Sequence, residues 1–146
     1  MVAMAILLLF SEFQEEDMYK VKEIDQYEFT RNIVLASIDG TEITVFDDSD
    51  LLGNNDFDFI KVGQSYNFKI GILGDVCKTG KEFIVGENQK IGEVVFRRLL
   101  DSKNNVFYLE PDNQAISDDE IGSKIKVDVE RYDILQVNET IHGGYV

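Results

Sequence analysis

The densest set of possible ligand atoms lies in one stretch, residues 47–58, which holds five aspartates and Phe57 and is followed directly by Phe59. Carboxylate oxygens bind calcium and magnesium, and in an exposed loop they also attract basic proteins. An exposed aromatic ring beside them would anchor such a partner, whereas a buried ring would belong to the core. The candidate partner-binding residues are Asp47, Asp48, Asp50, Asp56, Asp58, Phe57 and Phe59.

The spacing of these carboxylates excludes an EF-hand. When Asp48 is placed at the first position of the loop, Leu52 occupies the fifth and Phe59 the twelfth. Two ligands are then missing, and one of them is the bidentate glutamate. A divalent-cation site of another kind keeps three weak candidates, Asp48, Asp50 and Asp56, and no metal site is assigned.

The sequence offers few side chains for nucleophilic catalysis, because Cys77 and His142 are the only cysteine and histidine. His142 lies four residues from the C-terminus, where we expect a mobile tail, so a Cys–His dyad is not expected. A single thiol forms no internal disulfide, which favours a reducing compartment and a cytoplasmic location.

Phosphate-binding loops are also excluded. Residues 74–81 begin and end like a phosphate loop, but five residues separate Gly74 from Gly80 and Glu82 follows Lys81. The hydroxyl that binds magnesium is therefore missing, and we expect a hairpin turn here instead. The spacing of Gly71 and Gly74 does not fit a dinucleotide fingerprint. The sequence thus predicts no cofactor and a protein that is not an enzyme.

The overall charge argues against nucleic acid as a direct ligand. The chain has 146 residues, with 28 acidic and 14 basic side chains and a net charge of −14. Residues 1–75 carry 15 of the acids and only five of the bases. Binding of phosphates needs clustered lysine and arginine. The one basic doublet is Arg97-Arg98, which strand alternation splits between two faces, and we expect one of these arginines to pair with a carboxylate.

The elements that position these residues are mostly strands. Residues 66–72 alternate between large apolar and small or polar side chains, which is typical of a half-buried strand. Further strands are expected at 18–24, 29–38, 41–46, 82–85, 92–100, 106–110 and 124–137. Asp39-Gly40 predicts a first β-hairpin, and a change of phase near Glu130 predicts a bulge or break in the last strand. One or two short helical turns are expected, at 117–120 and 48–53.

The first ten residues form an apolar run about half as long as the roughly 20 residues that cross a bilayer. No lysine or arginine precedes the run, so it does not fit a secretory signal, and no membrane span is expected. Residues 1–18 are a buried strand, an extension preceding a start at Met18, or a targeting or lipid-facing segment. Residues 19–138 are expected to form one β domain, followed by a tail at 139–146.

Two segments of the chain look alike, residues 62–70 and 121–129. In each, an apolar residue, a glycine and a polar pair lead into an alternating strand. With this order of elements, residues 27–137 resemble small Greek-key barrels of the OB-fold type. The fold class is therefore expected to be mainly β, a single antiparallel barrel or sandwich. The resemblance implies binding of oligonucleotides or oligosaccharides, and the acidic surface opposes the former.

Three functions fit the sequence. The first is a non-enzymatic acidic interaction module, such as an inhibitor or immunity-type protein that blocks a basic, nucleic-acid-handling partner by mimicking phosphate. The second is a barrel that binds a small molecule or oligosaccharide through tyrosines such as Tyr27, Tyr108 or Tyr132. The third is an enzyme that uses carboxylates and a divalent cation. We favour the first, because it alone uses the charge. The oligomeric state is left open.

Overall fold

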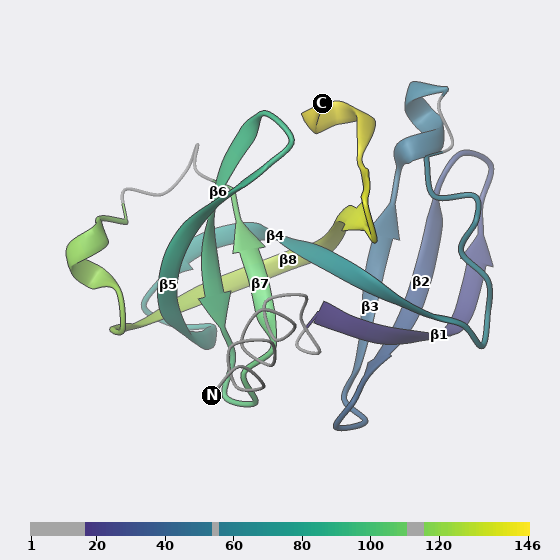
Figure 1. Ribbon diagram of the computed structural model, residues 1–146. Coiled ribbons are helices and arrows are strands. Elements are labelled where there is room, and N and C mark those ends of the chain that lie inside the picture. Colours follow the sequence, from purple (N-terminus) through teal and green to yellow (C-terminus); the bar gives the residue numbers. More distant parts are fainter. Residues whose placement is uncertain (1–16, 54–55, 111–115) are drawn as a thin grey trace, which may run out of the picture.

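The computed structural model describes residues 17–53, 56–110 and 116–146, and these residues form one sheet of nine strands (Figure 1). The expected mainly β fold is confirmed. The segment expected at 1–18 lies outside the described residues, apart from Asp17 and Met18. The strands are β1 (Met18–Gln26), β2 (Arg31–Ser37), β3 (Glu42–Asp47), β4 (Ser65–Cys77), β5 (Lys81–Ile91), β6 (Val94–Leu100), β7 (Val106–Leu109), β8 (Lys124–Val137) and β9 (Thr140–Ile141).

The first eight strands close into a ring. Their order is β3-β2-β1-β4-β7-β6-β5-β8, and a parallel pairing of β3 with β8 joins the two ends. The long strands β4 and β8 also pair with each other, antiparallel, and run through the middle of the molecule in Figure 1. Strands β1–β3 lie on one side of this pair and β5–β7 lie on the other.

The pairing pattern of β1–β4, here called the first half, is repeated by β5–β8, the second half. In each half the first strand pairs antiparallel with the second and the fourth, and the second pairs with the third. The third strand of each half pairs parallel with the fourth strand of the other half. The chain is therefore a structural repeat in which each half completes the other.

The two look-alike segments have equivalent places in the two halves. Gly63 precedes β4 and Gly122 precedes β8, and each has a φ of 88°, a left-handed conformation that glycine adopts without strain. The Gly63 amide donates to the Val21 carbonyl at 2.8 Å, and the Gly122 amide donates to the Val85 carbonyl at 2.8 Å. The similarity of the two segments is thus the sequence signal of the repeat.

The predicted bulge in the last strand is confirmed. Leu73 pairs with Arg131 and Gly74 pairs with Val129, so Glu130 is the extra residue on β8. A Cβ atom on Gly74 would lie 2.2 Å from a backbone oxygen of β8, and only glycine allows this approach. The bulge lets both parts of β8 turn apolar side chains into the core.

The prediction of a hairpin at residues 74–81 is wrong. Strands β4 and β5 do not pair with each other, because β8 lies between them and Val127 faces both Val76 and Lys81. The connection crosses β8 at Gly80, where φ is 131° and a Cβ atom would lie 2.5 Å from the Val127 carbonyl oxygen. A short glycine-containing loop therefore joins strands that are not neighbours.

The core follows the alternation predicted for β4, whose Phe68, Ile70 and Ile72 are buried. They belong to one large apolar cluster that draws side chains from both halves. A smaller cluster lies around Tyr108 and Leu135, and the second irregularity of β8 falls at Leu135. The larger cluster thus joins the two halves.

Helical structure in the described residues is limited to 3-10 turns, at η2 (Ser49–Leu52), η4 (Asp118–Glu120) and η5 (Gly143–Tyr145). The first two confirm the expected turns. The Ser117 side chain, at the start of η4, makes no hydrogen bond that caps the turn. In the described part of the chain, no helix has the length and apolar character needed to span a membrane.

The predicted hairpin at Asp39-Gly40 is confirmed as the turn between β2 and β3. The Ser37 amide donates to the Thr41 carbonyl at 2.9 Å, and Gly40 has a φ of 87°. The Asp39 carboxylate accepts hydrogen bonds from the Ser37 hydroxyl and from the Thr41 amide. These donors, the Ser37 hydroxyl first, lower the pKa of Asp39 from 3.8 to about 2.

The turn should therefore weaken in acid. Because folding lowers the pKa of Asp39, the ionised carboxylate stabilises the turn at neutral pH, and this contribution disappears as the pH falls from about 4 through about 2. A carboxyl-carbon NMR titration should give a midpoint near 2, and Ser37→Ala should move it back toward 3.8. A wild-type midpoint near 4 would contradict the hydrogen bonds described.

Candidate functional site

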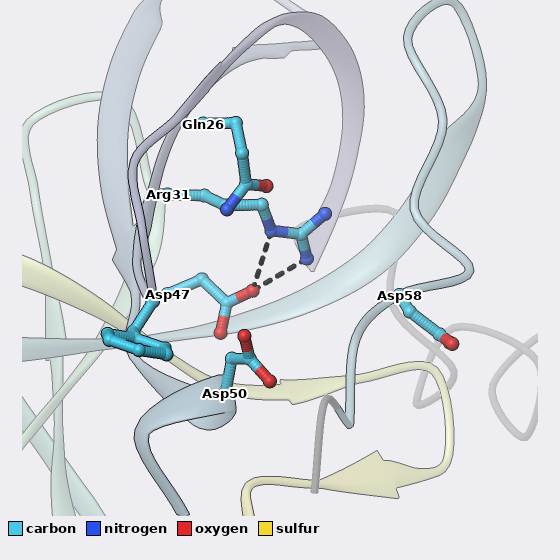
Figure 2. Close-up of a pocket in the computed structure, with 6 residues that line it drawn as sticks. Gln26, Arg31, Asp47, Asp50 and Asp58 are labelled. Carbon is cyan, nitrogen blue, oxygen red and sulfur yellow. Dashed lines mark hydrogen bonds and ion pairs between the residues drawn. The ribbon is translucent and has the colours of Figure 1, made fainter. Parts of the chain in front are cut away.

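The acidic stretch, residues 47–58, connects the end of β3 to the segment before β4, and the structure describes all of it except 54 and 55. Beside it lies a hollow of about 350 Å³, here called the turn pocket (Figure 2). The turn between β1 and β2 forms its other wall. The lining residues are Gln26, Phe29, Arg31, Asp47, Asp50 and Asp58.

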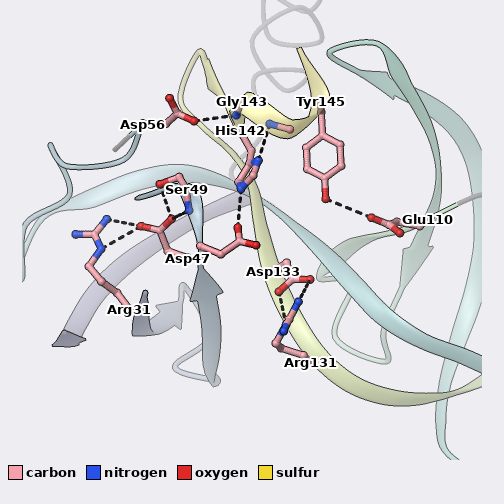
Figure 3. Close-up of polar contacts among 12 residues, drawn as sticks. Arg31, Asp47, Ser49, Asp56, Glu110, Arg131, Asp133, His142, Gly143 and Tyr145 are labelled. Carbon is pink, nitrogen blue, oxygen red and sulfur yellow. Dashed lines mark hydrogen bonds and ion pairs between the residues drawn. The ribbon is translucent and has the colours of Figure 1, made fainter. Parts of the chain in front are cut away.

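Asp47 is a structural residue at the base of the turn pocket and is only 4% exposed. Its Oδ2 accepts from Nη2 and Nε of Arg31 at 2.6 and 3.0 Å. Its Oδ1 accepts from the amide and hydroxyl of Ser49 at 3.0 and 2.7 Å, which holds the start of η2 (Figure 3). Arg31 also donates to the Phe57 carbonyl at 2.8 Å. The expectation that Asp47 contacts a partner is wrong, because burial hides its carboxylate.

Asp48 and Asp56 hold the C-terminal segment. Nε2 of His142 lies 2.6 Å from Oδ1 of Asp48, and Oδ2 of Asp56 accepts from the Gly143 amide at 2.8 Å (Figure 3). Nδ1 of His142 accepts from the Gly144 amide at 2.9 Å, so the proton on Nε2 is the one that faces Asp48. Asp48 and Asp56 therefore have a structural role, because they attach the C-terminal segment to the acidic stretch.

The expected mobile tail at 139–146 is wrong. His142 is only 7% exposed, and β9 and η5 occupy this segment. The Tyr145 hydroxyl donates to Glu110 at 3.2 Å, and the Glu93 amide donates to the Tyr145 carbonyl at 2.7 Å. Burial, followed by the charge of Glu110, raises the pKa of Tyr145. The side-chain contacts of Tyr145 and His142 reach residues 35 and 94 positions away in the chain, so no local pattern reveals them.

A second ion pair lies close to the His142 contact. Nε of Arg131 donates to Oδ1 of Asp133 at 2.6 Å (Figure 3). The Arg131 guanidinium also stacks 4.3 Å above the centre of the Phe46 ring. Burial raises the pKa of Asp133, while Arg131 acts in the opposite direction. The Arg131–Asp133 pair therefore lies at the junction of β3 with β8, and the Asp133 carboxylate is already bound by Arg131.

The weak metal candidates Asp48, Asp50 and Asp56 do not form a metal site in the part of the chain that the structure describes. Within that part, no group of three or more histidine, cysteine or carboxylate side chains is arranged to hold an ion. Asp48 and Asp56 are instead committed to the C-terminal segment.

Asp50 and Asp58 differ from the other aspartates of the stretch. Asp58 is exposed and Asp50 is partly exposed, and both line the turn pocket (Figure 2). Neither carboxylate has an ion pair with a residue in 17–53, 56–110 or 116–146. The pocket thus carries two uncompensated negative charges.

The exposed aromatic ring at the turn pocket is neither of the two phenylalanines expected as anchors. Phe57 is fully buried in the large core cluster, so its expected role as an anchor is wrong, and Phe59 packs edge-on against Tyr66 at 5.8 Å. Tyr27 and Phe29, in the turn between β1 and β2, are 55% and 50% exposed, and Phe29 lines the turn pocket. The strand expected at 29–38 includes Phe29, whereas β2 begins at Arg31 and leaves Phe29 in the turn.

One arginine of the basic doublet Arg97-Arg98 pairs with a carboxylate, as the sequence predicts. Arg97 is buried, and its Nη1 lies 3.1 Å from Oδ1 of Asp118. It also donates to the carbonyl oxygens of Gly86 and Ile116 at 3.2 and 2.8 Å. The predicted pairing of one arginine with a carboxylate is confirmed, and this guanidinium is not available to a nucleic acid.

Comparison with protein-family models and with curated proteins gives no match to this sequence. The function must therefore be argued from the site itself.

Proposed function

We propose that the protein is a non-enzymatic interaction module that binds a basic surface of another protein through the turn pocket. The observation that supports this most directly is the juxtaposition of exposed Phe29 with Asp50 and Asp58 around one hollow of about 350 Å³. Exposed aromatic rings supply most of the energy of protein interfaces, and charges at the rim set the rate of encounter.

The chemistry of the turn pocket suits an arginine or lysine side chain of the partner. The pocket's own cation, Arg31, is neutralised by Asp47, so an incoming cation meets the two free carboxylates. A guanidinium between Asp50 and Asp58 would also lie against the face of an aromatic ring, which stabilises cations. The net charge of −14 adds long-range attraction for a basic partner.

A nucleic-acid-handling protein is the partner class that best fits this arrangement. Such proteins hold lysine and arginine ready for phosphates, and carboxylates at the turn pocket would occupy those groups in place of phosphates. We therefore propose an inhibitor or immunity-type role, in which the module covers the basic site of its partner.

We further infer that the expected OB-type likeness applies to five of the strands. Strands β1, β2, β3, β8 and β4 form a closed cycle of pairings, with β3–β8 parallel and the others antiparallel. A Greek-key unit of five strands is the OB-type arrangement. This likeness concerns the backbone, and the proposed partner follows from the side chains.

The proposal predicts a specific loss of association. Asp50→Lys with Asp58→Lys should slow the association with the partner by about tenfold or more at low salt, and the difference should shrink at high salt. The partner is first captured from native lysate with the wild-type protein and identified by mass spectrometry. Association rates are then measured at several salt concentrations.

A matched control separates the pocket from net charge. Asp119→Lys with Glu139→Lys changes two other exposed acids, so the total charge is the same as in the pocket variant. The control should associate nearly as fast as the wild type and capture the same partner. If both double variants slow association equally, the pocket has no special role. If neither does, the proposal is overturned.

A further inference from the structure

The C-terminal segment, residues 140–146, is here called the strap, and one side of it is fixed to the second half. Ile141 and Tyr145 pack against the smaller apolar cluster. A Cβ atom on Gly92, in the turn between β5 and β6, would lie 2.2 Å from the Tyr145 carbonyl oxygen, so only glycine allows the strap to lie this close to the turn. The position of the strap relative to the second half is therefore set by close packing.

The other side of the strap contacts the acidic stretch. The stretch has two described limbs, here called the first and the second, residues 47–53 and 56–58. His142 of the strap contacts Asp48 of the first limb, with 2.6 Å between Nε2 and Oδ1. The amide of the next strap residue, Gly143, donates to Oδ2 of Asp56 in the second limb at 2.8 Å (Figure 3). Two neighbouring residues of the strap thus join the two limbs to each other.

The two carboxylates of the turn pocket lie on the same limbs (Figure 2). Asp50 follows Asp48 by two residues, and Asp58 follows Asp56 by two residues. In each limb, a carboxylate bound by the strap is therefore close in the chain to one that lines the turn pocket. A change in the separation of the limbs must then also change the separation of the two pocket carboxylates.

Arg31 joins the limbs a second time, from the side of the turn pocket. Its Nη2 donates to Oδ2 of Asp47 in the first limb at 2.6 Å and to the Phe57 carbonyl of the second limb at 2.8 Å. The limbs are thus held from two sides, by an arginine of the first half and by the strap. Loss of the strap contacts would leave Arg31 as the remaining side-chain link described here.

We infer that the strap positions the turn pocket for its partner. In this inference, the contacts of His142 and Gly143 keep Asp50 and Asp58 at the separation that one cationic side chain of the partner requires. It rests on the proposed function, and it adds a second element of the fold to that function. Asp48 and Asp56 are then positioning residues, which act on binding through the limbs and do not contact the partner.

The chemistry of the proposed contact explains why position matters. A guanidinium binds carboxylates best when two hydrogen bonds form at once, so its affinity depends on the placement of both acceptors. Limbs that are free to separate must also lose conformational freedom when the partner binds, which weakens the complex. A strap that holds the limbs in advance removes this loss.

Coupling between two sites is reciprocal, so a ligand in the turn pocket should also tighten the strap. The probe is N-acetyl-argininamide, which carries a single guanidinium, and the protein is the full chain at low salt. At a saturating probe concentration, hydrogen exchange of the Gly143 amide should slow about threefold or more, because this amide donates to the second limb. The Gly122 amide, which donates to Val85 in the second half, should not change.

Two double variants of equal charge separate position from charge. Asp48→Asn with Asp56→Asn keeps an oxygen that accepts from His142 and Gly143, whereas Asp48→Ala with Asp56→Ala removes it. The alanine pair should bind the probe about fivefold or more weakly than the asparagine pair, an effect within the usual range of coupling between sites. NMR titration measures both affinities. If the alanine pair does not fold, Asp56→Ala is compared with Asp56→Asn in the same way.

A control acts on the other side of the strap. Tyr145→Phe removes the hydroxyl that contacts Glu110 and keeps both contacts with the limbs, so it should bind the probe like the wild type. If the alanine and asparagine variants bind equally, or if Gly143 exchanges at the same rate with and without the probe, the inference about the strap is overturned.

The proposed function has a separate test with the same probe. Asp50→Lys with Asp58→Lys removes the pocket carboxylates and leaves the contacts of the strap in place, so it should abolish binding of the probe. If this variant binds normally, or if the wild type does not bind the probe, the proposed use of the turn pocket fails and the inference fails with it. If only the comparison of the alanine and asparagine pairs fails, the proposed function stands.

Discussion

Asp47→Ala should lower the free energy of unfolding by about 3–5 kcal/mol, as expected when one partner of a buried ion pair is removed. The substitution leaves the Arg31 guanidinium, whose side chain is only 12% exposed, without its carboxylate. It also removes the acceptor for the amide and hydroxyl of Ser49. Urea denaturation at neutral pH, followed by circular dichroism, measures the change.

Asp58→Ala is the natural comparison, because it removes a carboxylate of the same stretch that is exposed and has no ion pair in the described part of the chain. Its stability should lie within about 0.5 kcal/mol of the wild type, as is usual for surface changes. If Asp47→Ala were as mild as Asp58→Ala, the Arg31–Asp47 pair would not hold the base of the turn pocket.

Phe57→Ala should be comparably destabilising, by about 3–5 kcal/mol, because it leaves a cavity in a close-packed core. Phe57 is fully buried and is part of the large cluster shared by both halves. The same denaturation measurement applies. At a temperature where Phe57→Ala is still folded, its association with the partner should be close to that of the wild type.

Phe29→Ala should weaken partner binding and leave the stability of the fold almost unchanged, the opposite of Phe57→Ala. Half of this side chain is exposed, so stability should change by less than about 0.5 kcal/mol. Loss of the anchor should weaken partner binding by about 2 kcal/mol or more, the cost typical of an interface hot spot. A Phe57→Ala protein that folds normally but fails to bind would reverse these roles.

Much of the local structure follows from the sequence. Alternation locates the eight longer strands, Asp39-Gly40 locates a hairpin, and the phase change at Glu130 locates a bulge. These features depend on neighbouring residues, which a sequence shows directly. The order of the strands does not, because β8 pairs with three strands that lie far from it in the chain. The crossing at Gly80 therefore looked like a hairpin.

The sequence indicates a stretch of carboxylates but not how each of them is used in the fold. Composition shows a dense set of carboxylates, yet it does not show that Asp47 faces Arg31 or that Asp48 faces His142. Long-range contacts distinguish Asp47, Asp48 and Asp56 from Asp50 and Asp58, and such contacts are a tertiary property.

The exchange of strands between the halves determines how the protein must fold. Neither half can close alone, because β3 is completed by β8 and β7 is completed by β4. The contacts between β4 and β8 join residues about 50 to 70 positions apart, so a large loop must be closed before they form. Proteins rich in such distant contacts fold slowly and unfold in one cooperative step. A fragment that contains only one half is therefore expected to remain unfolded, and in an intact chain both halves are expected to unfold together.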